Sequence, residues 1–249
     1  MILSQIERYW TGRAEGYSEV NRHELATGQD RVWYREIARH LPRRKDLKIL
    51  DVGTGPGFFA ILLAREGYEV TAVDYTEAML DQARKNAGDM AEKIRFVRMD
   101  AQHLEFPDHT FDVVISRNLT WNLEQPEMAY GEWMRVLKEG GRLLNFDANW
   151  YHHLFDEEKR RAYEQDRRAV EALSLDDHYT CTDIDAMEDI ARKVPMSRTM
   201  RPAWDLEMLR AFRAKLVRAD ERVWERVWDP EEKVNYASTP MFLVSAVKG

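Results

Sequence analysis

The sequence has a single cysteine, Cys181, among its 249 residues. One thiol cannot close a disulfide within the chain, and it cannot supply the several thiolates of a structural zinc or iron–sulfur site. No apolar run reaches the roughly 18 residues of a membrane-spanning helix, and residues 1–10 lack the basic start and apolar core of a signal peptide. We therefore expect a cytoplasmic protein with no membrane partner.

The chain also has fewer basic than acidic residues. The 37 Lys and Arg residues are outnumbered by 44 Asp and Glu residues, and the formal net charge is −7. Because binding to nucleic acid relies on basic side chains that neutralise phosphates, no nucleic-acid partner is expected. With 44% apolar and 33% charged residues, the composition is that of a globular protein, and the length allows one α/β domain with an insertion.

The chain has only 12 glycines, yet three of them, Gly53, Gly55 and Gly57, stand at alternate positions within residues 48–57, KILDVGTGPG. An apolar strand precedes them and a helix-like run follows at once. This order is the layout of a nucleotide-binding crevice at the carboxyl end of a parallel strand. Glycine suits the turn because it leaves the backbone amides open to a ligand and tolerates positive φ. The turn alone does not say which nucleotide binds.

Strand and helix patterns alternate from this turn to residue 147. Strands are predicted at 48–52, 69–74, 94–99, 111–116 and 142–147, with helices between them. Such alternation favours an open, doubly wound, parallel α/β sheet of the Rossmann-like type. Two amphipathic helices are expected before the sheet. An aromatic patch at 9–17 is predicted between these helices, either as core or as a flap over a cofactor.

The alternation stops after residue 147. A charged helix is predicted at 157–173 and another helix at 204–212, followed by strand-like stretches at 216–228 and 241–247. The charge run in the first of these helices is interpreted as a solvated face.

The glycine spacing excludes the commonest dinucleotide motif. In G-x-G-x-x-G the third glycine packs beside a pyrophosphate, but here Phe58 fills that position. No G-K-[ST] follows, which disfavours a phosphate loop of the Walker type. Asp74 ends the second strand, where a carboxylate lies beside the ribose of a ligand seated on the turn.

Five motifs in order carry a family resemblance: 51–57 (DVGTGPG), Asp74, Asp100-Ala101, Phe111-Asp112 and 135–141 (RVLKEGG). The series resembles class I S-adenosylmethionine-dependent methyltransferases over residues 47–147. The segment 9–17 is similar to the small-molecule branch of that family, which includes the ubiquinone and menaquinone methyltransferases. The resemblance implies a mostly parallel seven-stranded sheet whose last strand is antiparallel, with the final hairpin at 216–247.

The strand–helix pattern, its break after residue 147 and the resemblance together predict four parts of the chain. They are an N-terminal helical flap (1–45), a cofactor-binding Rossmann-like core (46–147), an inserted helical substrate lid (148–203), and a C-terminal helix and strand pair that completes the sheet (204–249). The resemblance also implies S-adenosylmethionine as cofactor and a small-molecule substrate. We expect a monomer or a homodimer.

The cofactor-binding residues implied by the resemblance lie mainly at strand ends. Asp51 is expected to receive the ammonium of the cofactor, and Asp74 to accept both ribose hydroxyls through charged hydrogen bonds. Asp100 is expected to bind the exocyclic amine of the adenine, with a plain turn cap as the alternative. Asp112 is interpreted as such a cap. The full set is Tyr9, Trp10, Tyr17, Asp51, Gly53, Thr54, Gly55, Gly57, Asp74, Tyr75, Met79, Asp100, Ala101, Gln102, Arg117 and Asn118.

Methyl transfer needs an in-line nucleophile and a dry site, and it needs a base only if the acceptor holds a proton. His152 or His153 is the candidate base, with Tyr151 or Asp147 as positioning groups; two surface histidines are the alternative. Substrate contacts are predicted for Trp121, Asn122, Asn149, Trp150 and Trp204, with core packing as the alternative for the tryptophans.

Other hypotheses stay open at this point. A metal site built from His152, His153, His178, Cys181 and Asp183 is disfavoured, because adjacent histidines lack a ligand spacing, and no metal is expected. An inactive S-adenosylmethionine-binding scaffold would keep the same glycine turn. A nicotinamide- or flavin-dependent oxidoreductase is disfavoured by Phe58.

Overall fold

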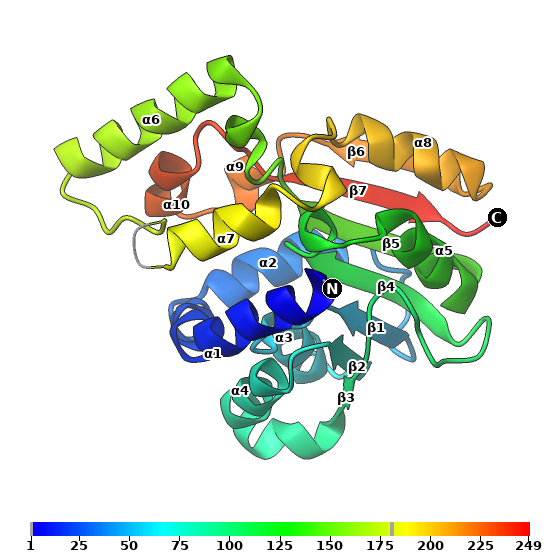
Figure 1. Cartoon of the computed structure of the whole chain (residues 1–249). Helices are drawn as coiled ribbons and strands as arrows, with labels where there is room; N and C mark the ends of the chain where they lie inside the picture. The colour runs from blue at the N-terminus through cyan, green and yellow to red at the C-terminus, as the bar shows by residue number, and fades with distance from the viewer. Residues whose placement is uncertain (1, 180–181) are drawn as a thin grey trace.

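The computed structural model describes residues 2–179 and 182–249. Its centre is a seven-stranded sheet with the order β3-β2-β1-β4-β5-β7-β6. β7 pairs antiparallel with β5 and with β6, and the pairs among the other strands are parallel. The predicted doubly wound sheet with an antiparallel last strand is confirmed (Figure 1). The strands are β1 (Lys48–Val52), β2 (Glu69–Asp74), β3 (Ile94–Arg98), β4 (Phe111–Arg117), β5 (Leu137–Asp147), β6 (Lys215–Asp220) and β7 (Phe242–Val247).

Each face of the sheet carries its own apolar core. Neighbouring residues of a strand point to opposite faces, so Ile49 and Leu50 of β1 enter different clusters. The Ile49 side packs on α2 (Gln29–Ala38) and α3 (Phe58–Arg65), where Trp33 meets Phe59 at 5.2 Å between ring centroids. The Leu50 side packs on α5 (Pro126–Val136) and α8 (Ala203–Ala211). The sheet is therefore buried on both of its faces.

The first forty residues differ from the prediction. α1 runs without a break over Ile2–Ala26, so the aromatic patch at 9–17 lies within a helix instead of between two. Tyr9 and Trp10 contact edge to face at 5.3 Å, and Tyr17 lies about two turns further along. α1 packs on α4 (Glu77–Ala87), which follows β2.

The insertion after β5 is helical, as predicted. It contains η3 (His152–Leu154), α6 (Glu157–Ala172), α7 (Ile184–Ala191) and η4 (Pro195–Ser197). The sequence pattern did not predict α7. This helix begins after Asp183, which caps it by accepting from the Ala186 amide at 3.1 Å.

The predicted strand at 216–228 is wrong in its second half. β6 ends at Asp220, and the chain then turns into α9 (Trp224–Val227) and α10 (Pro230–Asn235). Asp229 and Glu232 form a capping box that starts α10, and Pro230 occupies its first turn. Figure 1 shows α6, α7, α9 and α10 gathered at one end of the molecule, next to α1. The short helices η1 (Gly88–Lys93) and η2 (Thr120–Asn122) complete the chain.

Candidate functional site

A cavity of about 600 Å³ opens at the carboxyl ends of β1, β2 and β4, and α1, the insertion and residues 228–241 close it. It is lined by all of the predicted cofactor-binding residues except Gly57. It is also lined by Trp121, Asn122, Trp150 and Tyr151 from the predicted substrate side. The structure thus brings these residues together in one place; the role of each stays a prediction.

The glycine turn has the backbone that glycine permits. Gly53, Gly55 and Gly57 have φ of 66°, 54° and 91°. A Cβ on Gly53 would stand 2.8 Å from the Leu119 side chain. A Cβ on Gly57 would meet Ala83 at 3.0 Å, so this glycine allows α3 and α4 to pack and does not face the cavity.

Asp51 is buried at the end of β1, where Thr54 Oγ1 donates to its carboxylate at 2.6 Å. Burial raises the pKa of Asp51 to about 7. Its charged form therefore lacks full compensation, and a cationic group in the cavity would stabilise it.

Asp74 connects the turn to the next helix. Its two carboxylate oxygens accept from the amides of Gly55 and Thr76, each at 2.9 Å. Burial raises the pKa of Asp74, and these amide hydrogen bonds oppose the rise. Each oxygen keeps a further lone pair for a ligand hydroxyl.

Asp100 lies beyond β3 and accepts from the backbone and side chain of Gln102, at 2.9 and 3.1 Å. Trp133 Nε1 donates to the Ala101 carbonyl at 3.0 Å and holds this loop on α5. Asp112 lies outside the cavity and accepts from the Lys48 amide at 2.8 Å and from Lys138 at 2.9 Å, in line with its interpretation as a structural cap.

Arg117 ends β4 and forms a forked ion pair with Glu24 of α1, at 2.7 and 3.0 Å. Its guanidinium also lies 4.5 Å from the ring centroid of Phe58. Glu24 keeps the pKa of Arg117 high although burial lowers it. This pair fixes α1 over the cavity, and the sequence offered no signal for Glu24 because the two residues are far apart in the chain.

Two cavity residues other than glycine have a left-handed backbone, Asn118 at φ 56° and Tyr151 at φ 63°. Asn118 accepts from Trp121 Nε1 through its carbonyl at 2.9 Å, and from Trp150 Nε1 through its side chain at 3.3 Å. Strained residues of this kind gather at functional sites. Here the strain accompanies the placement of two tryptophans at the cavity.

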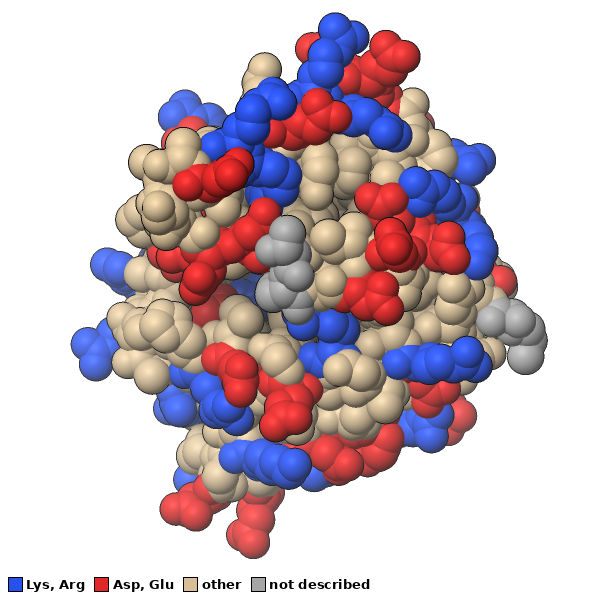
Figure 2. Space-filling view, turned by 60° about the vertical axis from the view of Figure 1, so that its left-hand side comes forward, with Lys and Arg blue, Asp and Glu red and all other residues tan. Residues whose placement is uncertain are grey.

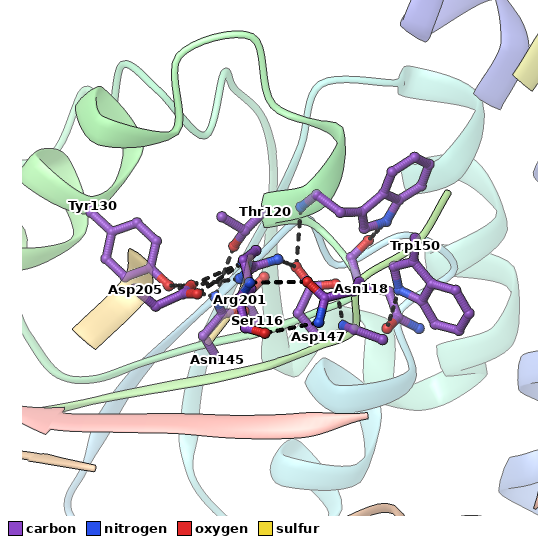
Figure 3. A network of polar contacts seen from close by, with 12 residues as sticks. Ser116, Asn118, Thr120, Tyr130, Asn145, Asp147, Trp150, Arg201 and Asp205 are labelled. Carbon is purple, nitrogen blue, oxygen red and sulfur yellow. Dashed lines mark hydrogen bonds and ion pairs between the residues drawn. The ribbon is translucent and has the colours of Figure 1, made fainter. Parts of the chain in front are cut away.

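Asp147 does not line the cavity, which corrects its prediction as a positioning group for substrate. Figure 3 shows Arg201 between Asp147 and Asp205, and all three side chains are fully buried. Arg201 donates to Asp147 at 2.5 Å and to Asp205 at 2.6 Å. Asp147 also accepts from the Trp121 amide at 3.1 Å, so it acts on the cavity only through the loop that it holds.

The predicted base is not supported either, because neither His152 nor His153 lines the cavity. His153 is buried and stacks on Tyr163 at 4.1 Å between ring centroids. Burial lowers the pKa of His153 to about 4. His152 Nδ1 lies 3.2 Å from the Ser197 carbonyl. Adjacent residues in a short helix point in different directions. The direction of each histidine is set by its contacts within the insertion.

Asn149 and Trp204 are likewise outside the cavity lining, contrary to their prediction as substrate contacts. Asn149 exchanges hydrogen bonds of 2.8 and 3.0 Å with the backbone of Arg201. Trp204 packs edge to face on Tyr130 at 5.7 Å, which is the core packing considered as its alternative.

One whole wall of the cavity was not predicted from the sequence. That wall comes from the insertion and from the segment around α10, and includes Asp176, Tyr179, Trp228, Glu231, Glu232 and Tyr236. The Asp-Pro-Glu-Glu run at 229–232 could have indicated a helix start. Nothing local to it indicates that the helix faces the glycine turn.

Within residues 2–179 and 182–249, no three His, Cys, Asp or Glu side chains are grouped so as to hold a metal ion. Cys181, one of the ligands considered above, lies outside the described residues. In the same part of the chain no helix is both long and apolar enough to span a membrane.

The comparison with protein families is decisive for the centre of the chain. Residues 50–145 match the model of the methyltransferase domain. This segment is therefore similar to a methyltransferase domain. The match covers β1 to β5, and the predicted resemblance to class I methyltransferases is confirmed for it.

Curated relatives of this methyltransferase domain include two demethylmenaquinone methyltransferases. The one from Bacteroides fragilis is 35% identical and the one from Deinococcus radiodurans 38% identical, each over 145 residues. Both alignments cover 56% of this chain and 58% of the relative, so the chain spans less than two thirds of the relatives it matches.

Solved structures extend the likeness of fold beyond the domain. A Methanococcus maripaludis protein considered to be an S-adenosyl-L-methionine-dependent methyltransferase has a TM-score of 0.62 at 17% identity, and the alignment covers 96% of this chain and 93% of that one. Geranyl diphosphate C-methyltransferase from Streptomyces coelicolor A3(2) has a TM-score of 0.61 at 16% identity, with 91% and 77% covered. At these identities the likeness is one of fold.

Proposed function

We propose that the chain binds S-adenosylmethionine and catalyses transfer of its methyl group to a small-molecule acceptor. The observation that carries the proposal is the glycine turn, which with Asp74 and Asp100 lines one wall of a ligand-sized cavity. The matched methyltransferase domain supports it, since the domain contains all three of these features.

The residues present fit this cofactor. Asp51, whose burial is incompletely compensated, suits the ammonium group, and Asp74 has lone pairs left for the ribose hydroxyls. Tyr75 and Met79 line the cavity beside Asp74 and suit the two faces of the adenine. Phe58 occupies the place of a third glycine and packs on Trp33, which disfavours a pyrophosphate.

When bound, the cofactor supplies an electrophilic methyl carbon on a sulfonium that leaves as a neutral thioether, while the acceptor gives the electron pair. The chain has to hold the acceptor in line and keep water out. Trp121, Trp150 and Tyr151 supply apolar surface for that purpose. Burial raises the pKa of Tyr151 well above its usual value, so its hydroxyl keeps its proton and can orient the acceptor as a donor. We propose that the segment 148–203 acts as the lid over the acceptor.

Calorimetry with S-adenosylhomocysteine tests the cofactor assignment. We expect binding of S-adenosylhomocysteine and none of NAD. Asp74→Ala should weaken the binding by about 10–100-fold, because a hydrogen bond to a charged group contributes about 1.5–3 kcal/mol. Asp81→Ala is the matched control, since Asp81 is an exposed carboxylate of α4 outside the cavity.

Unchanged binding by Asp74→Ala, with its melting temperature close to that of the wild type, would overturn the assignment. Binding without formation of S-adenosylhomocysteine from S-adenosylmethionine across a panel of acceptors would favour the inactive scaffold instead.

A further inference from the structure

The wall of the cavity opposite the glycine turn is built from aromatic rings. Tyr236 lies at its centre, with Trp150 at 5.2 Å, Trp228 at 5.6 Å and Tyr179 at 6.2 Å between ring centroids. All four residues line the cavity. The ring of Trp150 stands at 82° to that of Tyr236, so the cluster presents ring faces and edges in several directions. Such an arrangement offers the negative faces of the rings to a ligand.

The same wall carries carboxylates. Asp176, Glu231 and Glu232 line the cavity beside these rings, and Glu24 faces them from α1. Figure 2 shows acidic and basic side chains interspersed over this side of the molecule, with basic ones also near the middle of the view. Among the described residues that line the cavity, the two arginines are Arg13 and Arg117, against nine Asp and Glu residues. Three of the nine are Asp51, Asp74 and Asp100, which the proposed function assigns to the ammonium, the ribose and the adenine of the cofactor.

The basic side chains closest to this wall already have acidic partners. Arg117 forms its forked pair with Glu24, and His178 Nε2 lies 3.3 Å from Glu231 Oε1. The Glu232 carboxylate accepts from the Asp229 amide at 2.9 Å. Burial, with the negative charge of Glu24 as a smaller cause, raises the pKa of Glu232 to about 7, against the opposing charge of Arg117. A cation beside Glu232 would favour the charged form of its carboxylate, which burial disfavours.

An independent observation comes from Asn122, a cavity residue that is only 6% exposed. Its Oδ1 atom is buried and has no hydrogen-bond partner in the part of the chain that the structure describes. A buried acceptor without a donor costs free energy. A ligand that brings an N–H or O–H group would relieve this cost.

We propose that the acceptor substrate carries a cationic group, a protonated or quaternary amine, held between the rings of Trp228 and Tyr236 and the carboxylates of Glu231 and Glu232. This inference rests on the proposed function, of which it names the substrate class. Aromatic faces and carboxylates both attract a desolvated cation, and cages of this kind recognise quaternary ammonium groups. An anionic acceptor would be repelled by the same wall, and a neutral one would bring no charge to favour the ionised form of Glu232.

The test compares choline with 3,3-dimethyl-1-butanol, its neutral isostere in which carbon replaces nitrogen. Calorimetry is done on the full chain saturated with S-adenosylhomocysteine. We expect choline to bind at least 10-fold more tightly than the isostere. Glu231→Gln/Glu232→Gln should weaken choline binding about 10-fold and leave the isostere unchanged; glutamine can still accept the Asp229 amide and preserve the capping box. Glu225→Gln, an exposed carboxylate outside the cavity, is the control that should change neither.

The outcomes separate the two proposals. If S-adenosylhomocysteine does not bind, the proposed function fails and this inference falls with it. If S-adenosylhomocysteine binds but choline and its isostere bind equally, or the double variant binds choline like the wild type, the cationic substrate class alone is overturned.

Discussion

Single buried titratable side chains make the stability of this protein depend on pH, and they do so in opposite directions. Burial raises the pKa values of Asp51 and Glu232 to about 7, so the folded state binds more protons than the unfolded state between their ordinary values and pH 7. Stability from these two groups falls as the pH rises through that window. His153 acts in the reverse sense. Its pKa falls from 6.5 to about 4, so the unfolded state binds the extra proton and stability falls as the pH decreases below 6.5.

Replacing His153 should remove its share of the acid sensitivity. In His153→Phe the ring stacked on Tyr163 is kept and the titration is lost. From pH 7.5 to pH 5 the wild type should lose about 2 kcal/mol more unfolding free energy than the variant, as follows from the two pKa values. Urea denaturation at both pH values measures this difference, and comparing the two proteins cancels the contributions of Asp51 and Glu232.

The control for losing a histidine is His109→Gln, because His109 is half exposed. It should keep the pH dependence of the wild type. An equal loss of unfolding free energy in the wild type and in His153→Phe would contradict the burial of a neutral imidazole at this position.

At the scale of elements, one buried ionic network joins the end of the insertion to the sheet. Arg201 connects β5 through Asp147 with α8 through Asp205, and Tyr130 of α5 donates to Asp205 at 2.5 Å. Asn145 Nδ2 extends the network to Thr120 at 2.8 Å. Because Asp147 and Asn145 both hold η2, the network positions the loop that carries Trp121 and Asn122 (Figure 3).

Removing the cation of this network should be costly. Arg201→Met leaves Asp147 and Asp205 buried without an opposite charge, and we expect a loss of about 3–5 kcal/mol of unfolding free energy in urea. Arg192→Met breaks an ion pair with Glu188 in which Arg192 is about half exposed, and should cost less than about 1 kcal/mol.

A triple variant shows whether charge is the cause. Arg201→Met combined with Asp147→Asn and Asp205→Asn removes both orphaned charges, and should recover at least half of the loss. If Arg201→Met costs no more than Arg192→Met, or the triple variant is the least stable of all, uncompensated charge is not the reason for the effect.

At the scale of the whole molecule, the cavity lies between parts that differ in burial. β1 and β4 lie inside the sheet with helices on both faces, whereas α6 buries only Asp166 and Val170. The glycine turn is attached to the first of these parts, and the acidic aromatic wall to the second. Ligand binding should therefore connect a rigid wall with a more readily opened one.

Hydrogen exchange followed by mass spectrometry tests this arrangement. Without ligand, amides of β1 and β4 should exchange most slowly and those of α6 much faster. Addition of S-adenosylhomocysteine should slow exchange at residues 53–57 and in α1. It should leave α5 and α8 unchanged, because neither helix lines the cavity. Slowing confined to α5 and α8 would place the ligand elsewhere.

The sequence by itself determined the features that depend on short stretches of chain. The glycine turn, Asp74 and Asp100 follow strands whose apolar patterns are local, and parallel strands necessarily bring their carboxyl ends to one edge. That is why fifteen of the sixteen predicted cofactor-binding residues line one cavity. Gly57 is the exception, because its neighbour is Ala83 of a helix one strand further along.

Only the tertiary structure decided which polar residues line the rest of the cavity. Asp147 ends a strand as Asp74 does, yet an arginine 54 residues later turns it into a buried ion-pair partner. His153 is directed by a ring of α6, and the wall of Trp228, Glu232 and Tyr236 is brought to the cavity by α10 packing on α6. These contacts join segments that are distant in the chain, and no local spacing specifies them. Local order thus determined the wall that contains the glycine turn, and long-range packing determined the aromatic wall.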